Sequence, residues 1–168
     1  MTDIIKGEHP ILTTPIDVFD FQNPPENPQD IAMELMKTMN NNNGIGLAAN
    51  QIGKQYRVFA IRGYPENYVC FNPRIVHTSE ENIVLEEGCL SFPNLLVKIK
   101  RPKQIRVRFQ TPSGVVETKV FDGLTARVFQ HELDHLDGVL FYKRANRIHR
   151  EQAFKKLEKL NGKSKRQK

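Results

Sequence analysis

Two histidines four positions apart constrain this chain more than any other feature. They lie in the segment QHELDH, residues 130–135, which places His131 and His135 one helical turn from each other. In an α-helix, such residues share one face, with their Cβ atoms about 5–6 Å apart. Both imidazoles therefore reach one metal ion, and the spacing predicts a metal-binding helix.

The residue after the first histidine is Glu132. On a helix its side chain is turned by about 100° from that of His131, yet it stays close enough to move a proton beside the metal. His-Glu-x-x-His is the pattern of zinc-type hydrolases, and we interpret Glu132 as the acid–base group. The alternative is a chance meeting of two surface histidines.

The flanking residues predict how this helix begins, packs and ends. Asp122 is expected to cap its start, and Gly138 is a natural stop. Leu124, Val128 and His131 fall on one stripe. We therefore expect the metal-binding face of the helix to be its buried face as well.

A catalytic metal of this type takes three protein ligands and keeps one position open. Downstream, Glu151 and Glu158 lie among lysines and arginines, and we interpret them as solvated charges. A zinc endopeptidase with Glu158 as the third ligand stays an alternative. Cys89 is more favourable, because it follows a glycine in a turn after a predicted strand and a thiolate suits zinc or ferrous iron. Its other interpretation is a small buried hydrophobic residue.

The segment GIGLAANQ, residues 44–51, is similar to a dinucleotide-binding glycine finger. Such a finger follows a strand and opens a helix. Here a predicted helix, residues 29–41, precedes it and a predicted strand, residues 57–61, follows. Two interpretations stay open: a plain connection, or a loop on the substrate side where glycine lets a ligand approach and Gln51 offers an amide.

Alternating apolar and polar residues predict a series of short strands joined by turns. They lie near residues 57–61, 68–71, 74–77, 82–85, 95–99, 105–109 and 115–121, with a further short strand at 139–142. The connections are too short for crossover helices, so the strands pair antiparallel. A short helix near residues 17–21 and a last helix over 147–160 complete the pattern. We predict the α+β class: small antiparallel β-sheets packed around a central metal-binding helix, with a C-terminal helix.

Charge is distributed unevenly along the 168 residues. Residues 143–168 hold 11 Lys and Arg against 2 Glu, a formal net charge of +9, and residues 1–142 carry −3. We divide the chain into a single catalytic domain, residues 1–145, and a basic C-terminal helix and tail, residues 146–168, with 163–168 expected to be disordered. The tail suggests an anionic partner, RNA first. A non-enzymatic RNA-binding protein with a structural metal site is therefore another alternative.

Location is predicted from what the chain lacks. No apolar run approaches the ~18 residues of a membrane span, and the N-terminus has no secretion signal. The two cysteines have no repeated spacing, which favours a reducing compartment. We expect a cytoplasmic monomer without membrane association.

Three motifs together resemble the peptide deformylase family. They are GxGLAAxQ at residues 44–51, EGCLS at 87–91 and QHExDHLxG at 130–138, in the family's order. The resemblance implies a metal-dependent hydrolase that removes the formyl group from the N-terminal formyl-methionine of nascent polypeptides and releases formate. It also implies Fe²⁺ as the cofactor, with Zn²⁺, Ni²⁺ or Co²⁺ able to occupy the same site.

The family motifs assign roles to the matched residues. The resemblance implies that Cys89, His131 and His135 bind the metal and that Glu132 transfers the proton to the departing amine. The metal and two hydrogen-bond donors would stabilise the charge that develops on the formyl oxygen.

Those two donors are the Gln51 amide and the backbone N–H of Leu90. Glu87 and Gln130 are expected beside the metal ligands, where they would orient them. Ordinary loop and helix polarity is the alternative explanation for both.

The same resemblance predicts the residues that bind substrate. Gly46 and Gly88 would let the peptide backbone dock like a strand, and Ile45 and Leu124 would line the pocket for the methionine side chain. Arg127 departs from the usual apolar residue at its position, and we expect its stem to cover the pocket while its guanidinium points to water.

The basic tail resembles the C-terminal helix with which some deformylases dock on the ribosome. The ribosome, through its RNA, is therefore a predicted partner. The alternative is an amphipathic helix that packs on the body of the protein.

Overall fold

The computed structural model describes residues 2–165 as a sequence of short strands and four α-helices. The helices are α1 (Pro10–Thr13), α2 (Pro28–Asn41), α3 (Gly123–Leu136) and α4 (Arg147–Lys165), with 3-10 turns η1 (Ala49–Ile52) and η2 (Phe141–Arg144). The strands are β1 (Gly46–Ala48), β2 (Val58–Ile61), β3 (Tyr68–Thr78), β4 (Asn82–Cys89), β5 (Phe92–Pro102), β6 (Gln104–Gln110) and β7 (Val116–Asp122).

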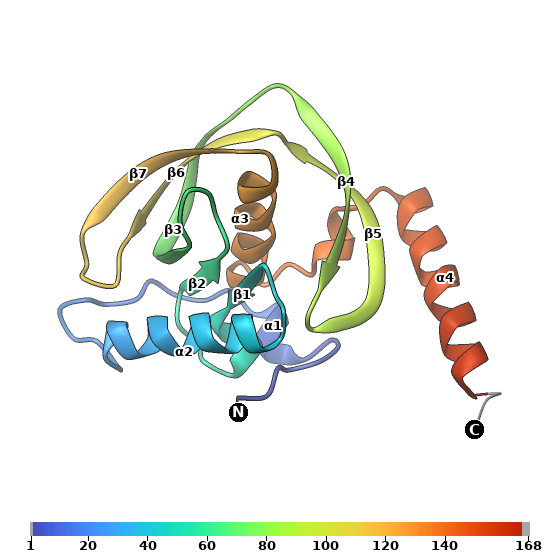
Figure 1. Cartoon of the computed structure of the whole chain (residues 1–168), viewed down its shortest axis with the longest axis horizontal. Coiled ribbons are helices and arrows are strands. Elements are labelled where there is room, and N and C mark those ends of the chain that lie inside the picture. Colours follow the sequence, from blue (N-terminus) through green and yellow to red (C-terminus); the bar gives the residue numbers. More distant parts are fainter. Residues whose placement is uncertain (1, 166–168) are drawn as a thin grey trace.

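Two antiparallel sheets surround helix α3 (Figure 1). The larger has the strand order β1-β2-β3-β6-β7, and the smaller is the pair β4-β5. Helix α3 stands between them, and α4 projects at the end of the molecule beyond β5 (Figure 1). The predicted fold class is confirmed.

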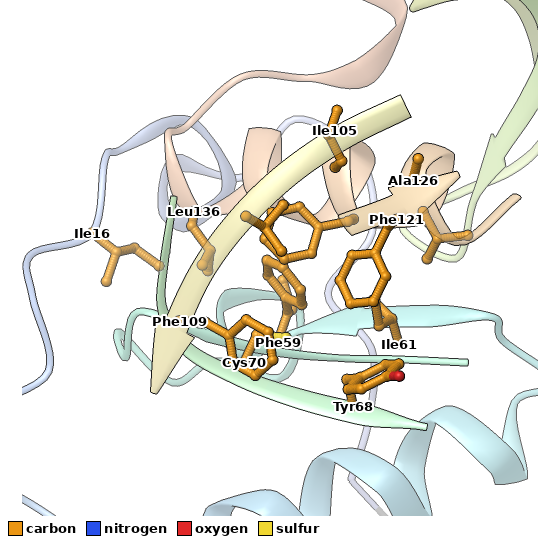
Figure 2. Packing of buried hydrophobic residues seen from close by; sticks show 14 residues of the cluster. Ile16, Phe59, Ile61, Tyr68, Cys70, Ile105, Phe109, Phe121, Ala126 and Leu136 are labelled. Atoms are coloured by element: carbon orange, nitrogen blue, oxygen red, sulfur yellow. The ribbon is translucent and has the colours of Figure 1, made fainter. Parts of the chain in front are cut away.

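The inner face of the larger sheet packs on α3 through aromatic rings (Figure 2). The rings of Phe59 on β2 and Phe129 on α3 meet edge to face, with their centroids 5.0 Å apart. Phe121 on β7 contacts Phe129 from the other side. This packing fixes the rotation of α3 and therefore the direction of its polar residues.

Helix α2 covers the opposite face of the larger sheet near β1 and β2. Its start is set by Asn27, whose side chain accepts a hydrogen bond from the N–H of Gln29 at 2.9 Å. Ile31, Leu35 and Met39 form the predicted apolar stripe and are fully buried. The predicted boundaries of this helix are confirmed to within one residue.

Several sequence-based expectations about local structure are wrong. The N-terminal helix lies at Pro10–Thr13 and not near residues 17–21. The strand predicted at residues 139–142 is absent from the described residues, and residues 141–144 form the 3-10 turn η2, in which the N–H of Lys143 donates to the carbonyl of Leu140. The position of Asp122 at the start of α3 is confirmed, but its side chain accepts from the Gln104 amide and caps nothing.

The C-terminal segment also differs from its prediction. Helix α4 continues to Lys165, so residues 163–165 are helical; residues 166–168 lie outside the described part. The first half of α4 packs on the body, where Phe154 meets Tyr142 edge to face and Ala153 is buried. The division at residue 145 stays a prediction. No helix within residues 2–165 is both long and apolar enough to cross a membrane.

Gly138, directly after α3, gives a stability prediction. Its φ is +70°, and a Cβ there would lie 2.8 Å from the backbone carbonyl of Thr13. Gly138→Ala therefore has two costs, because alanine is strained at this left-handed backbone conformation and its Cβ clashes with the Thr13 backbone. We expect the free energy of unfolding, measured by urea denaturation, to fall by about 3 kcal/mol. Gly162→Ala is the control, because a Cβ there meets nothing within 4 Å and alanine favours the helix. A loss below about 1 kcal/mol at Gly138 would contradict the explanation.

Candidate metal centre

Helix α3 and the end of β4 bring three metal-binding side chains together. The rings of His131 and His135 lie on one face of α3, with centroids 5.2 Å apart. Cys89 ends β4, where the register with β5 shifts after Glu87. One ligand atom from each of Cys89, His131 and His135 lies within 4.8 Å of the other two. The sulfur of Cys89 is 3.2 Å from Nε2 of His135.

This donor set fits a divalent transition metal. One thiolate and two imidazoles are ligands that zinc and ferrous iron both accept, and three protein ligands leave a position for substrate or water. Nδ1 of His131 is hydrogen-bonded to Glu87, so its Nε2 is the nitrogen that faces the site. The candidate ligands predicted from the sequence therefore converge.

The two histidines differ in their proton affinity. Burial and then the neighbouring His131 lower the pKa of His135 well below its ordinary value, so this imidazole is neutral and offers a lone pair. Burial opposes a charge on His131 too, but its hydrogen bonds to Cys89 and Glu87 raise its pKa. A cation that binds between Cys89 and His131 therefore displaces a proton.

Glu87 orients the His131 ring by a hydrogen bond to Nδ1, the ring nitrogen that faces away from the site. Its Oε2 lies 2.9 Å from Nδ1 of His131, and Arg101 donates to both carboxylate oxygens at 2.7 and 3.0 Å. Burial would raise the pKa of Glu87, but the hydrogen bonds from His131 and Arg101 hold it well below the ordinary range. Glu87 is therefore ionised, and the predicted contact with a metal ligand is present.

Arg101 and Asp134 complete this network, and sequence reasoning missed both. Arg101 is 5% exposed and donates to Asp134 at 2.8 Å as well as to Glu87. Arg144 donates a hydrogen bond to the other carboxylate oxygen of Asp134 at 2.7 Å. Arg101 could have been recognised as buried from its position on β5. It continues the alternate series of the buried residues Val97 and Ile99, so its side chain points to the same face.

Arg127 contradicts its prediction. It is 4% exposed, and its guanidinium does not point to water. Instead it donates to Glu87 at 2.8 Å and to the carbonyl oxygens of Ile99 and Ile83 at 2.9 and 2.7 Å. The buried carboxylate of Glu87 and the two carbonyl oxygens attract the charged group inward, because each gives a buried guanidinium donor a partner.

Glu132 faces the site without a hydrogen-bond partner for its Oε2 among residues 2–165. Burial raises the pKa of Glu132 to about 7, although the charge of His131 opposes the shift. A Cβ on Gly46 would lie 2.8 Å from both Cδ of Glu132 and Cγ1 of Val128. Glycine is therefore required at residue 46 for the Glu132 carboxyl to occupy this place.

Gln51 lies beside the thiol. Its Oε1 accepts from the N–H of Ala48 at 2.9 Å, which fixes the amide orientation. Its Nε2 then points to the Cys89 sulfur at 3.6 Å and to the Ser91 hydroxyl at 3.1 Å. Gln51 belongs to η1, so the segment 44–51 is a strand followed by a 3-10 turn, neither a nucleotide finger nor a bare loop.

The N-terminal arm ties two of the motifs together, which the sequence did not indicate. The N–H of Ile5 donates to the carbonyl of Gln51, and the N–H of Gly7 donates to that of Ser91, each at 2.8 Å. Between them, the Lys6 ammonium donates to the carbonyl of Leu90 at 2.6 Å.

A cleft of about 610 Å³ opens beside these residues. The predicted site residues that line it are Ile45, Gly46, Gln51, Glu87, Gly88, Cys89, Leu90, Leu124, Arg127, His131 and Glu132. Leu124 is 61% exposed at the rim, so its predicted place on the buried face of α3 is wrong.

Gln130 does not line the cleft, and its side-chain amide donates to the carbonyls of Pro102 and Ala126. It therefore holds α3 to β5 and orients no metal ligand directly.

Comparison with known proteins places this geometry in a family. The family model described as polypeptide deformylase matches residues 1–151. A peptide deformylase of Novosphingobium aromaticivorans is 35% identical and covers 94% of this chain and 96% of its own length. One from Synechocystis is 42% identical over 69% of this chain and 65% of its own length.

Solved structures agree with the sequence matches. A class I type b peptide deformylase from Acinetobacter baumannii, described as bound to Met-Ala-Ser, superposes with a TM-score of 0.80 at 32% identity. The match covers 86% of this chain and 99% of that one.

The network around Glu87 gives a prediction for stability without metal. Glu87→Gln leaves the buried guanidinium groups of Arg101 and Arg127 without their shared carboxylate. We expect a loss of about 3–5 kcal/mol in urea denaturation of the metal-free protein. The control is Glu86→Gln, an exposed neighbour on the same strand, with an effect within about 0.5 kcal/mol. Equal losses for the two variants would contradict this role for Glu87.

Proposed function

Because the chain belongs to the polypeptide deformylase family, and is thus a metal-dependent hydrolase of N-formylated polypeptides, we propose that Cys89, His131 and His135 hold its metal ion. Glu132 moves the proton in the same proposal. The observation that carries it is the convergence of the three ligand atoms within 4.8 Å beside a buried carboxyl. We keep Fe²⁺ as the proposed ion, with Zn²⁺, Ni²⁺ or Co²⁺ as substitutes.

The chain's own groups divide the work of hydrolysis. When bound, a divalent ion is a Lewis acid that polarises a carbonyl oxygen and lowers the pKa of water. Glu132 accepts a proton from the attacking water and delivers it to the departing amine. A carboxyl with a pKa of about 7 suits both steps near neutral pH. Formate and a free N-terminus result.

Two donors are proposed for the formyl oxygen as charge develops on it. One is Nε2 of Gln51, which the hydrogen bond from Ala48 orients toward the Cys89 sulfur. The other is the backbone N–H of Leu90, whose segment the N-terminal arm holds in place. One such donor contributes roughly 3–4 kcal/mol to the transition state in comparable sites.

The substrate is proposed to dock as an extended strand in the cleft. Strand β1 is an edge of the larger sheet, and β4 pairs only with β5, so both strands have a side free for a peptide. Gly46 and Gly88 lie on these strands and line the cleft, as do the partly exposed Ile45 and Leu124. The buried Arg127 adds the stem of its side chain to the wall.

The two competing functions lose their support. Glu158 lies exposed on α4 and is not among the residues that converge on a metal, so it supplies no third ligand. Membership of the family makes the chain an enzyme rather than a binding protein alone. A cytoplasmic monomer stays a prediction.

The decisive experiment is formate release from formyl-Met-Ala-Ser by anaerobically prepared ferrous protein. We expect Glu132→Gln to lower kcat by about 10²–10⁴-fold while the iron content of the purified protein stays the same. Cys89→Ala should lose both iron and activity, because one of three ligands is gone. Full activity of either variant, or no formate from the native chain, would refute the assignment.

The basic surface of α4 is proposed to bind the ribosome. Its first half is part of the folded body, so deletion from residue 143 would remove packed residues such as Ala153. Neutralising the exposed Lys155, Lys156 and Lys159 to Gln is therefore a cleaner test. We expect weaker co-sedimentation with bacterial 70S ribosomes, most clearly at low salt, with unchanged turnover of the tripeptide.

The matched control for that variant is Lys37→Gln/Arg62→Gln/Lys98→Gln, which removes three exposed charges outside α4. Equal ribosome binding by the triple variant and the native chain would contradict the proposal. A parallel fall in tripeptide turnover would show that α4 acts through the fold instead.

A further inference from the structure

Three arginines stand close together on the outer face of the larger sheet, away from the metal centre. The register places Arg74 on β3 directly opposite Arg108 on β6. Arg106 is two residues from Arg108 on the same strand and therefore on the same face. All three are exposed. Like charges directly opposite each other on a sheet are destabilising, so the fold gains nothing from this arrangement.

Three acidic side chains near this group have partners other than the arginines. Glu81 pairs with Lys103 at 3.1 Å, and Glu117 pairs with Lys119 at 3.4 Å. Asp122 accepts from the Gln104 amide at 3.2 Å. Within residues 2–165, none of the three arginines has a hydrogen bond or an ion pair to another side chain.

The residues of β7 directly opposite the arginines of β6 are uncharged, and Asp122 lies at the end of the same face, opposite Gln104. Thr118 on β7 lies opposite Arg108, and Val120 lies opposite Arg106; both are exposed. The other side of β6 packs on α3, and α2 covers the sheet only near β1 and β2 (Figure 1). The outer face of β3, β6 and β7 is therefore left to solvent.

The three arginines are separate from the basic C-terminal helix. Strands β6 and β7 lie at one end of the long axis of the molecule and α4 lies at the other (Figure 1). It is also not a result of general basicity, because residues 1–142 carry a formal net charge of −3. The arginines form a local positive site on a mildly acidic body.

We propose that this face, through Arg74, Arg106 and Arg108, binds the phosphate backbone of RNA. Guanidinium groups bind phosphate oxygens in a two-pronged geometry, and unpaired ones have all their donors available. Residues two apart on a strand are about 6.8 Å apart, which lets neighbouring arginines follow successive phosphates. Phosphate contacts carry no sequence information, so the binding is independent of base sequence.

RNA is favoured over an acidic protein by the function of the enzyme. Its substrates are nascent polypeptides, which emerge from an RNA-rich particle. An exposed face that presents arginines fits a phosphate backbone better than it fits a folded acidic domain, which needs a complementary apolar core to bind stably.

The test is the double variant Arg106→Gln/Arg108→Gln with the C-terminal helix intact. The probe is a fluorescein-labelled single-stranded RNA of mixed sequence, followed by fluorescence anisotropy between about 50 and 200 mM KCl. We expect at least about fivefold weaker binding at the lowest salt, and a log–log salt slope that is smaller by about 1.4. The control Lys37→Gln/Arg62→Gln removes the same charge from exposed positions elsewhere and should change affinity less than twofold.

Two further readouts separate this proposal from a structural role and from the proposed catalytic function. The thermal midpoint of Arg108→Gln should not fall, because the substitution removes a like-charge pair. Turnover of formyl-Met-Ala-Ser needs no RNA and should stay within twofold of the native chain. Unchanged RNA affinity and slope in the double variant would overturn the proposal. So would displacement of the RNA by poly-glutamate as effectively as by unlabelled RNA.

Discussion

The carboxylate of Glu87 is the interaction on which the rest of the site depends. It is 6% exposed and belongs to β4, yet it bonds to Arg101 on β5 and to His131 and Arg127 on α3. One side chain thus joins the smaller sheet to the metal-binding helix. Because two guanidinium groups and a histidine converge on it, removal of the carboxylate would leave several buried donors unpaired at once.

Charge balance in this interior requires a second acid, and Asp134 provides it. Arg101 bridges Glu87 and Asp134, so each buried arginine has a carboxylate partner. Asp134 lies between the two histidines of the motif, so α3 carries the candidate metal ligands and the partner of Arg101 on the same turns. Through Glu87 the network reaches His131 and fixes the orientation of its ring.

Features that depend on the local spacing of residues were predictable from the sequence. The direction of a side chain whose hydrogen-bond partners lie on distant strands was not. Two histidines four apart on a helix, and a cysteine after a glycine turn, were sufficient to predict three candidate ligands that converge in the structure. The inward direction of Arg127 was not predictable, because its carbonyl partners Ile83 and Ile99 come from strands whose register the sequence does not give. Arg101 is an intermediate case: it continues the alternation of buried residues on β5, but the strand was predicted only over residues 95–99, which left Arg101 outside it.

The group formed by Arg74, Arg106 and Arg108 also depends in part on strand register, which the sequence does not give. Alternation over residues 105–109 predicts which residues of β6 are exposed, and Arg106 and Arg108 are among them. Their opposition to Arg74, however, depends on the register shift that follows Phe71, where β3 passes through Asn72 with φ +49°. A strand that simply broke at the following proline would have placed Arg74 elsewhere. The irregularity therefore brings the like charges together, while the Asn72 side chain at the same point bonds to Phe19 and Gln110 and joins β3 to the N-terminal arm and β6.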